Sequence, residues 1–304
     1  MRRLAFWMAL LSVGSVAAAA SGAETSWRPL WNGRDLSGWT TWLAKPHASA
    51  VLHDAPRDAK GNFSQPIGPN RDPLGVFSVV NTDGQPAIRI SGQVFGEPRS
   101  TAAFTDYRLR LQFKWGEKKW PPRETAETPR DSGLLYHVHA EPGAEGRTRA
   151  RSIEIQIQER DVGDLYAIGA MIYVRSKLRP TSGGAGTNAA ARPIHDYDER
   201  GSRNIFARVP GMSGRCVKQP DNEKPTGEWN TVEIVCLGAD SIHIVNGTVV
   251  MRLHGPIRID TPTPQPVTAG PVILRLEGAE IFHRAIELQP ITAIPTEFAL
   301  ASAP

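Results

Sequence analysis

The chain has 304 residues, of which 40% are hydrophobic and 22% charged, with 35 Lys and Arg against 31 Asp and Glu. These ordinary globular proportions exclude a disordered chain and a coiled coil, and 2 cysteines cannot build a disulfide-dense scaffold or a four-ligand zinc knuckle. The 28 Gly and 25 Pro residues follow no collagen period and therefore indicate a fold rich in turns.

The N-terminal segment has the features of a Sec-type signal peptide over residues 1–23. The basic start Met1–Arg3 is followed by an apolar run (4–20) and by small residues, which predicts cleavage before Glu24. The alternative is a buried or membrane-anchoring helix, for which the run is short and rich in Ala, Gly and Ser. We therefore expect one periplasmic or secreted domain over residues 24–304, without a membrane span in the mature chain.

Cleavage would also remove Arg2 and Arg3, which leaves a nearly neutral mature chain. The sequence has no Lys- and Arg-rich face with interleaved aromatic side chains, the pattern typical of single-strand nucleic-acid binders. We expect neither a nucleic-acid partner nor a nucleotide cofactor.

Apolar and polar residues alternate along much of the chain, which is typical of half-buried β-strands. Asn246-Gly247 between two alternating runs is a strong hairpin signal. The strands that alternation predicts span residues 107–115, 131–139, 152–158, 231–236, 241–245, 247–253, 272–276 and 281–288. Because no convincing amphipathic helix separates them, they predict an all-β sandwich of two antiparallel sheets.

Two long segments lack this alternation, residues 49–73 and 177–225, and we expect them to be loops. Cys216 lies in the second segment and Cys236 ends a predicted strand. In an oxidising compartment they could form a structural disulfide, and the alternative is two buried thiols. We favour the disulfide.

The strand over residues 152–158 carries an unusual polar face. Its outward side chains are Ser152, Glu154, Gln156 and Gln158, spaced about 7 Å apart along the strand. Such a row offers hydrogen-bond donors and acceptors together, as hydroxyl-rich ligands require, whereas a merely solvated face is the alternative.

A pair of histidines precedes this strand. Alternation places His137 and His139 on one face of residues 131–139, and Glu154 from a neighbouring strand would complete a two-His, one-carboxylate site for a divalent metal ion. Two structural histidines are the alternative interpretation, and the spacing alone leaves both open.

Residues 154–159 also have the outline of the strand motif of retaining β-glucanases, which need two carboxylates about 5 Å apart. The middle acid of that motif is replaced here by Gln156, and on a regular strand Glu159 points away from Glu154. A sugar-binding strand is indicated, but direct displacement at the anomeric carbon is not.

Several motifs in combination resemble the 3-keto-disaccharide hydrolase (DUF1080) family, described as 3-keto-glucoside 1,2-lyase/3-keto-2-hydroxy-glucal hydratases. Its signatures read Leu-Phe-Asn-Gly-Lys-Asp-Leu-Ser-Gly-Trp, Asn/Asp-Ser-Gly, Glu-Val-Gln, Gly-Glu-Trp-Asn and Leu-Asn-Gly, followed by a closing strand. The segments similar to them are Leu30–Trp39, Asp131–His137, Glu154–Gln156, Gly227–Thr231, Asn246-Gly247 and Glu277–Phe282. The resemblance runs from about Trp27 to Pro290.

This resemblance implies a concanavalin A-like jelly roll with long loops and an enzyme that cleaves 3-keto-glycosides. A ketone at C3 acidifies the C2 proton, so that a base removes it and the aglycone leaves C1 by β-elimination. Water can then add to the enone, for net hydrolysis. One divalent metal ion on the C2 and C3 oxygens would act as a Lewis acid.

The resemblance also implies roles for particular residues. His137 and Glu154 are expected to be base or metal ligand, and Lys114 to face the enolate oxygen. The side chains expected to bind substrate hydroxyls are Asp131, Gln156, Gln158, Asp164 and Glu277. The aromatic side chains that could stack on a sugar are Trp115, Trp120 and Tyr166.

Two other functions use the same polar face. One is a non-catalytic, lectin-like carbohydrate-binding module, and the other is a retaining glycanase. In all three cases the expected partner is a carbohydrate, and for the lyase it is an oxidised 3-keto-glycoside.

Overall fold

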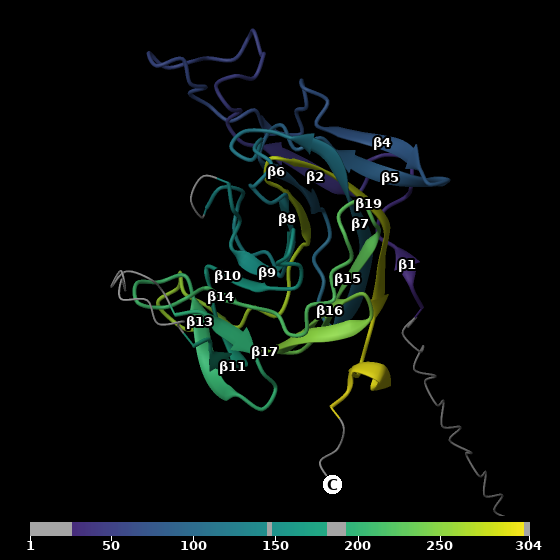
Figure 1. The fold of residues 1–304 in the computed structure, drawn as a ribbon, viewed down its shortest axis with the longest axis vertical. Helices are drawn as coiled ribbons and strands as arrows, with labels where there is room; N and C mark the ends of the chain where they lie inside the picture. Colours follow the sequence, from purple (N-terminus) through teal and green to yellow (C-terminus); the bar gives the residue numbers. More distant parts are fainter. Residues whose placement is uncertain (1–25, 145–147, 181–192, 301–304) are drawn as a thin grey trace, which may run out of the picture.

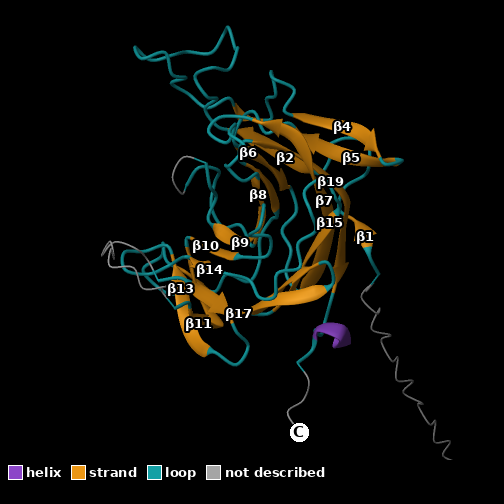
Figure 2. Cartoon of the chain, in the orientation of Figure 1, coloured by secondary structure: helices purple, strands orange, loops and turns teal. Residues whose placement is uncertain are grey.

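The computed structural model describes residues 26–144, 148–180 and 193–300, so the predicted signal peptide lies outside the described residues. The described chain is all-β (Figures 1 and 2) and forms two antiparallel sheets, with a single 3-10 turn, η1 (Thr296–Phe298), near its end. This confirms the predicted two-sheet jelly-roll sandwich. Within the described residues, no helix has the length and apolarity that crossing a membrane would demand.

The larger sheet has eleven strands. They are β1 (Arg28–Pro29), β4 (Phe77–Thr82), β5 (Gln85–Ile90), β7 (Tyr107–Lys119), β11 (Ala170–Leu178), β12 (His195–Tyr197), β13 (Ser202–Ala207), β15 (Asn230–Leu237), β16 (Asp240–Val245), β17 (Thr248–Arg258) and β19 (Ala279–Pro290). Their order is β12-β11-β17-β16-β15-β7-β19-β5-β4, with β1 paired to β19 and β13 to β11.

The smaller sheet has eight strands and carries the polar row predicted from the sequence. They are β2 (Trp39–Leu43), β3 (Gly68–Pro69), β6 (Gly96–Ser100), β8 (Asp131–Tyr136), β9 (Ser152–Gln158), β10 (Leu165–Ile168), β14 (Arg215–Cys216) and β18 (Ile273–Leu276). Their order is β14-β10-β9-β8-β18-β6-β2-β3, so the polar strand β9 lies between β10 and β8.

Period-2 alternation builds the core between the sheets. Leu109, Leu111 and Phe113 of β7 are fully buried from one side, and Ile153 and Ile155 of β9 from the other. In Figure 1, β8 and β9 lie on one side of this core and β7 and β15 on the other. Because one face of each strand fills the core, the alternate residues must lie on the outer faces of the sheets.

One predicted loop contains strands. Residues 177–225 hold the end of β11 and all of β12, β13 and β14, whereas residues 49–73 hold only the two-residue strand β3. In β13 only Phe206 and Ala207 are buried, so this edge strand lacks the alternation of a strand with one fully buried face. The prediction of a continuous long loop was therefore wrong.

The predicted disulfide is also wrong. Cys216 lies in β14 of the eight-stranded sheet and Cys236 in β15 of the eleven-stranded sheet, and both are buried free thiols. Burial raises the pKa of both thiols, which makes them unreactive.

Two histidines in the core link stability to pH. His283 of β19 is fully buried, and neither ring nitrogen has a hydrogen-bond partner among the described residues, whereas His243 Nε2 lies 3.0 Å from the Tyr136 hydroxyl. Burial lowers the pKa of each imidazole to about 3. Both are therefore neutral in the folded chain at any pH above that value.

We predict that in His283→Leu the free energy of unfolding falls less steeply as the pH is lowered than in the wild type. Between about pH 6.5 and the lowered pKa the unfolded chain binds more protons, so each such histidine lowers the free energy of unfolding by up to about 1.4 kcal/mol per pH unit as the pH falls. Urea unfolding at several pH values measures the slope of the free energy of unfolding against pH. The exposed His53→Gln is the control and should leave it unchanged; equal slopes for His283→Leu and the wild type would contradict the assignment.

Candidate functional site

The polar residues of β9 lie on the outer face of the eight-stranded sheet. Ile153, Ile155 and Ile157 belong to the core, so Glu154 and Gln156 project from the opposite face. The backbone register extends this face over the neighbouring strands in two adjacent rows. The first row contains Trp42, Glu97, Arg275, Gly133 and Gln156, and the second contains Thr40, Arg99, Ile273, Leu135, Glu154 and Tyr166.

Gly133 creates the space in which the central contact forms. A Cβ atom on this residue would lie 2.1 Å from Oε1 of Glu154, so any larger residue would collide with the carboxylate. In that space the Arg275 Nη1 donates to Glu154, at 3.1 Å from Oε1 and 3.4 Å from Oε2. The absence of a side chain on Gly133 thus leaves room for the Glu154 side chain from the next strand.

Further charged side chains extend this contact into a network. The other end of the Arg275 guanidinium pairs with Glu277. Arg123, from the segment after β7, donates to Asp131 and lies 3.6 Å from Glu277. Glu154, Asp131 and Glu277 are each 5% exposed or less. Their carboxylates therefore contact guanidinium groups instead of water.

Burial raises the affinity of these carboxylates for protons. Loss of solvation raises the pKa of Glu154, and Arg275 offsets that rise only in part while neighbouring Asp131 adds to it. Burial also raises the pKa of Asp131, against the opposing charges of Arg123, Arg275 and Arg149. Two buried carboxyls with raised pKa values beside a guanidinium are suited to move a proton to and from a ligand.

Gln156 belongs to the same group, because its Nε2 donates to Asp131 Oδ1 at 3.1 Å. Its Oε1 is buried and has no hydrogen-bond partner among the described residues. Gln158 lies further along the strand, where its Nε2 donates to Asp161 at 2.7 Å in the following turn. The structure thus places Gln156 in the network and Gln158 beside it.

Asp164 forms a second, adjoining pair. Its Oδ2 accepts from Arg215 Nε at 2.7 Å and its Oδ1 accepts from the Lys218 backbone N–H at 2.9 Å. Burial raises the pKa of Asp164 to about 6 despite these partners. Arg215 in turn lies 5.9 Å from the Tyr166 ring, which is opposite Glu154 in register. Asp164 therefore positions Arg215 and Tyr166 beside the site.

His137 does not reach the outer face, contrary to the sequence prediction. It follows β8 with a left-handed φ of 50°, which breaks the alternation. Its ring packs edge-on against Tyr107 of the opposite sheet, at 5.8 Å between centroids, and its Nδ1 donates to the Val267 carbonyl at 3.1 Å. Burial lowers the pKa of His137 to about 4, so it is a neutral core residue.

Lys114 is also not part of this group. It lies on the outer face of the other sheet, where its Nζ donates to Asp83 at 2.6 Å and stands 5.0 Å from the Trp229 ring. The error has a simple cause. Alternation assigned Lys114 correctly to a polar face but cannot tell which sheet β7 joins.

The ligands predicted for a metal ion do not converge. His137 faces the core, the ring nitrogens of His139 lie 3.1 Å and 3.4 Å from the carbonyls of His137 and Gly169, and Glu154 binds Arg275. Over the part of the chain that the structure describes, no three His, Cys, Asp or Glu side chains group as a metal site requires. The predicted set does not fit, and no step below is routed through a metal.

Several residues of the site were missed at the level of sequence. Arg275 alternates with the apolar residues of β18 and precedes Glu277 by two positions, so the sequence could have indicated that both lie on the same face. Arg123 comes from a connecting segment, and Trp42 and Glu97 come from strands that alternation did not reveal. No local pattern identifies these three.

A cavity opens beside the network. It has a volume of about 450 Å³ and lies over β2 and β6, and the residues that line it are Thr40, Thr41, Trp42, Pro69, Asn70, Glu97, Arg99, Glu141 and Pro142. Glu97 and Arg99 belong to both this cavity and the two rows described above. The cavity thus gives solvent access to one end of the outer face.

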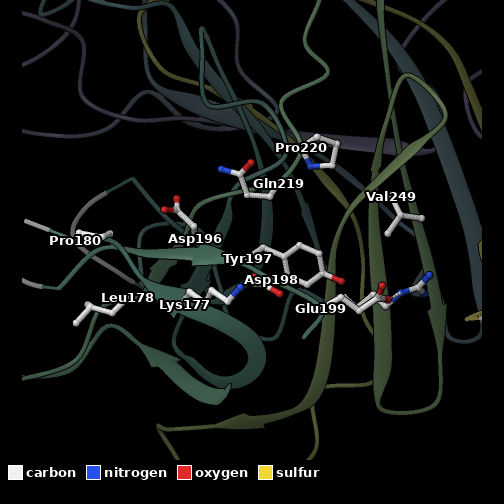
Figure 3. A pocket seen from close by; sticks show the side chains of 11 residues that line it. Lys177, Leu178, Pro180, Asp196, Tyr197, Asp198, Glu199, Gln219, Pro220 and Val249 are labelled. Carbon is white, nitrogen blue, oxygen red and sulfur yellow. Dashed lines mark hydrogen bonds and ion pairs between the residues drawn. The ribbon is translucent and has the colours of Figure 1, made fainter. Parts of the chain in front are cut away.

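A larger cavity, of about 800 Å³, lies elsewhere over β11, β12 and β17 (Figure 3). Its charged groups pair with one another: Lys177 with Asp198, and Arg252 with Glu199 at 3.1 Å. Neither Glu154 nor any of its partners lines this cavity, so we do not assign the site to it.

Comparison with known families identifies the family of the chain. Residues 26–289 match the model of the 3-keto-alpha-glucoside-1,2-lyase-like domain. The chain belongs to this family. It is therefore a carbohydrate-active protein, and the strand with Glu154 and Gln156 lies well inside the matched region. No curated protein matches the sequence.

Solved structures show only distant similarity. A Parabacteroides distasonis protein named as a candidate glycosyl hydrolase has 15% identity and a TM-score of 0.42, over 87% of this chain and 94% of that one. The Bacillus licheniformis β-glucanase has 11% identity and a TM-score of 0.35, over 89% and 99%. The Bacillus subtilis carbohydrate-binding module CBM66 has 9% identity and a TM-score of 0.38, over 70% and 91%. At these values the similarities carry no argument about activity.

We predict that Gly133→Ala destabilises the protein by about 1–3 kcal/mol, because the added methyl group collides with the Glu154 carboxylate. Glu154→Ala removes that collision, so the double variant should lose less than the sum of the two single losses. Urea unfolding of the four proteins measures the coupling. Strict additivity would show that the carboxylate does not occupy the space above Gly133.

Proposed function

We propose that the outer face of the eight-stranded sheet cleaves 3-keto-glycosides, with Glu154 as the base that removes the C2 proton. The observation that carries this proposal is the buried Glu154 carboxylate, with a raised pKa, in contact with the Arg275 guanidinium. Family membership supplies the class of substrate.

Glu154 suits proton abstraction next to a ketone. A carboxylate in water is a weak base, and burial strengthens it by destabilising its charge. In the resting site the charge of Arg275 favours the ionised form of Glu154, and their contact orients the carboxylate. The backbone register places Gln156 and Asp131 beside it, where they can hold ring hydroxyls.

Arg275 takes the electrophilic role that the sequence analysis gave to Lys114. As C2 loses its proton, negative charge develops on the C3 oxygen. A guanidinium group in a site shielded from water stabilises that charge better than solvent does. Arg275 is 3% exposed and already lies within 3.1 Å of the base, so base and electrophile can act on adjacent carbons.

The reaction needs one more group, an acid that protonates the leaving oxygen. The C2 electrons form the C1=C2 double bond and break the bond from C1 to the leaving oxygen, which then takes a proton. Asp131 has a raised pKa and bonds Gln156 at 3.1 Å, and we assign it this proton. Hydration reverses the transfers. The proton on Glu154 exchanges with solvent after elimination; water then adds its oxygen to C1 and gives its proton to Asp131, and Glu154 delivers the exchanged proton to C2.

Substrate must displace part of the existing network to reach Glu154, which is 1% exposed. Arg123 is the side chain placed to move, because it reaches Asp131 and Glu277 from the segment after β7 and is itself 18% exposed. Substrate oxygens would then replace its contacts with the carboxylates.

A retaining glycanase fits the geometry less well. Glu159, the second acid of the glucanase-like outline, accepts from the Arg130 backbone N–H at 2.7 Å and pairs with the Arg130 side chain at 2.8 Å. It also accepts from the Thr226 hydroxyl at 2.7 Å. Glu159 is thus held by partners of its own and does not pair with Glu154 as a nucleophile would.

We predict that Glu154→Gln lowers kcat on 3-keto-glucosides by about 10²- to 10⁴-fold, the usual contribution of a general base, while sugar affinity is largely kept. Because the base must be ionised, wild-type kcat should rise with pH through a limb above the ordinary carboxyl range. Product formation followed by NMR measures both. The exposed Glu228→Gln is the control and should behave as the wild type.

Two results would overturn the proposal. One is sugar binding without turnover by the wild type, which would make the protein a binding module. The other is full activity of Glu154→Gln. Cleavage of unoxidised β-glucans would instead identify a glycanase.

We further propose that the chain is exported, on the basis of the signal-like residues 1–23. Expression of the full-length gene in a bacterial host should give periplasmic or secreted protein whose N-terminal sequence begins at Glu24. Cytoplasmic protein that retains Met1 would contradict the proposal.

A further inference from the structure

Arg149 lies in the connection between β8 and β9, close to the outer face of the eight-stranded sheet. The residue before it, Thr148, lines a hollow of about 500 Å³ together with Trp42 of β2. The residue after it, Ala150, is fully buried and belongs to an apolar cluster with Leu135 of β8. Because β18 and β6 lie between β8 and β2, Arg149 is placed over the strands that carry the charged network.

The charge of Arg149 acts on both carboxylates of the proposed reaction. Burial raises the pKa of Glu154 and of Asp131, and the positive charge of Arg149 opposes that rise at each of them. Coulomb interactions weaken with distance, so a guanidinium that affects both groups lies near both. This agrees with the position of Arg149 over the outer face.

Arg149 differs from the other guanidinium groups of the network in its contacts. Arg275 is shared between Glu154 and Glu277, and Arg123 donates to Asp131. Within the part of the chain that the structure describes, Arg149 forms no hydrogen bond or ion pair, although its Nε is buried. Buried donors without a partner are rare in proteins, and a ligand that brings an acceptor would explain this one.

A complementary acceptor belongs to the same network. Gln156 Nε2 donates to Asp131 at 3.1 Å, whereas Gln156 Oε1 is buried and has no partner among the described residues. A sugar hydroxyl can donate to Gln156 and accept from Arg149, and a ketone oxygen can only accept. The unpaired donor and acceptor together therefore suit a ring that carries a hydroxyl group beside a carbonyl.

Arg149 also has the charge that the proposed elimination needs. As C2 loses its proton, negative charge develops on the C3 oxygen. A guanidinium that contacts no carboxylate attracts this charge more strongly than Arg275, which already binds two carboxylates. A contact with Arg149 also breaks no ion pair with another described residue.

We propose that Arg149 is a substrate-binding residue that donates to the C3 oxygen of the reacting ring and, with Arg275, stabilises the negative charge that develops there. This inference rests on the proposed function. It adds a contact from the β8–β9 connection to those of the strands.

The test measures kcat and KM for cleavage of methyl 3-keto-glucoside over a range of pH. Arg149→Ala should lower kcat by about 10²- to 10³-fold, the usual cost of removing one donor to a developing oxyanion. Loss of the positive charge should also raise the pKa of Glu154, so the limb through which kcat rises with pH should move to higher pH. Methylguanidinium, at concentrations far below those that unfold proteins, should restore part of the activity.

Two further variants separate charge from contact geometry. Arg149→Lys keeps the charge and loses the planar fork of donors, so kcat should fall while the pH limb stays near its wild-type position. Arg28→Ala removes an exposed arginine at the edge of the other sheet and is the matched control. Thermal unfolding of each variant confirms that it is folded.

Wild-type kcat in Arg149→Ala would overturn the inference. A loss of kcat with neither a shift of the pH limb nor rescue by methylguanidinium would also overturn it, because a purely structural role predicts that result. If the wild type cleaves no 3-keto-glucoside, the proposed function fails, and calorimetry with the intact 3-keto-glucoside still tests Arg149. Affinity that falls in Arg149→Ala and not in Arg28→Ala supports the contact, and equal affinity of all three proteins contradicts it.

Discussion

The contact between the Glu154 carboxylate and the Arg275 guanidinium above Gly133 organises the whole outer face. A charge buried to this degree is tolerated only with a partner, and removal of one partner leaves the other uncompensated at a cost of about 3–5 kcal/mol. Each member of the network therefore depends on the next: Arg275 also holds Glu277, and Arg123 joins Glu277 to Asp131. Burial makes the carboxylates of Glu154 and Asp131 stronger bases by raising their pKa values, and the guanidinium groups hold them in position.

The same alternation that builds the core also builds the site, so much of both could be predicted. The isoleucines of β9 indicate a strand with one buried face, and this pattern by itself assigns Glu154 and Gln156 to the opposite face. His137 was misplaced because a single left-handed residue ends β8 and reverses the alternation. Few residues other than glycine adopt this conformation, and the enrichment of histidine there is too weak to predict one position.

Other parts of the site depend on contacts that no local pattern contains. Lys114 was misplaced because alternation along β7 does not reveal which sheet the strand joins. Arg123 reaches the carboxylates from a connecting segment, and Arg275 meets Glu154 only through the pairing of β18, β8 and β9. These relations arise from long-range register. They extend the site from a single base on β9 to a charged network that includes residues of β8 and β18 and of the segment after β7.

The central claim is that Glu154 removes a proton from C2 before the glycosidic bond breaks. The most direct measurement is NMR of the products of a 3-keto-glucoside cleaved in D₂O, with a sample lacking protein to correct for spontaneous exchange. Elimination followed by hydration predicts deuterium at C2 of the released 3-keto-sugar, at a rate that falls with turnover in Glu154→Gln. Cleavage that retains the original C2 proton would contradict the account.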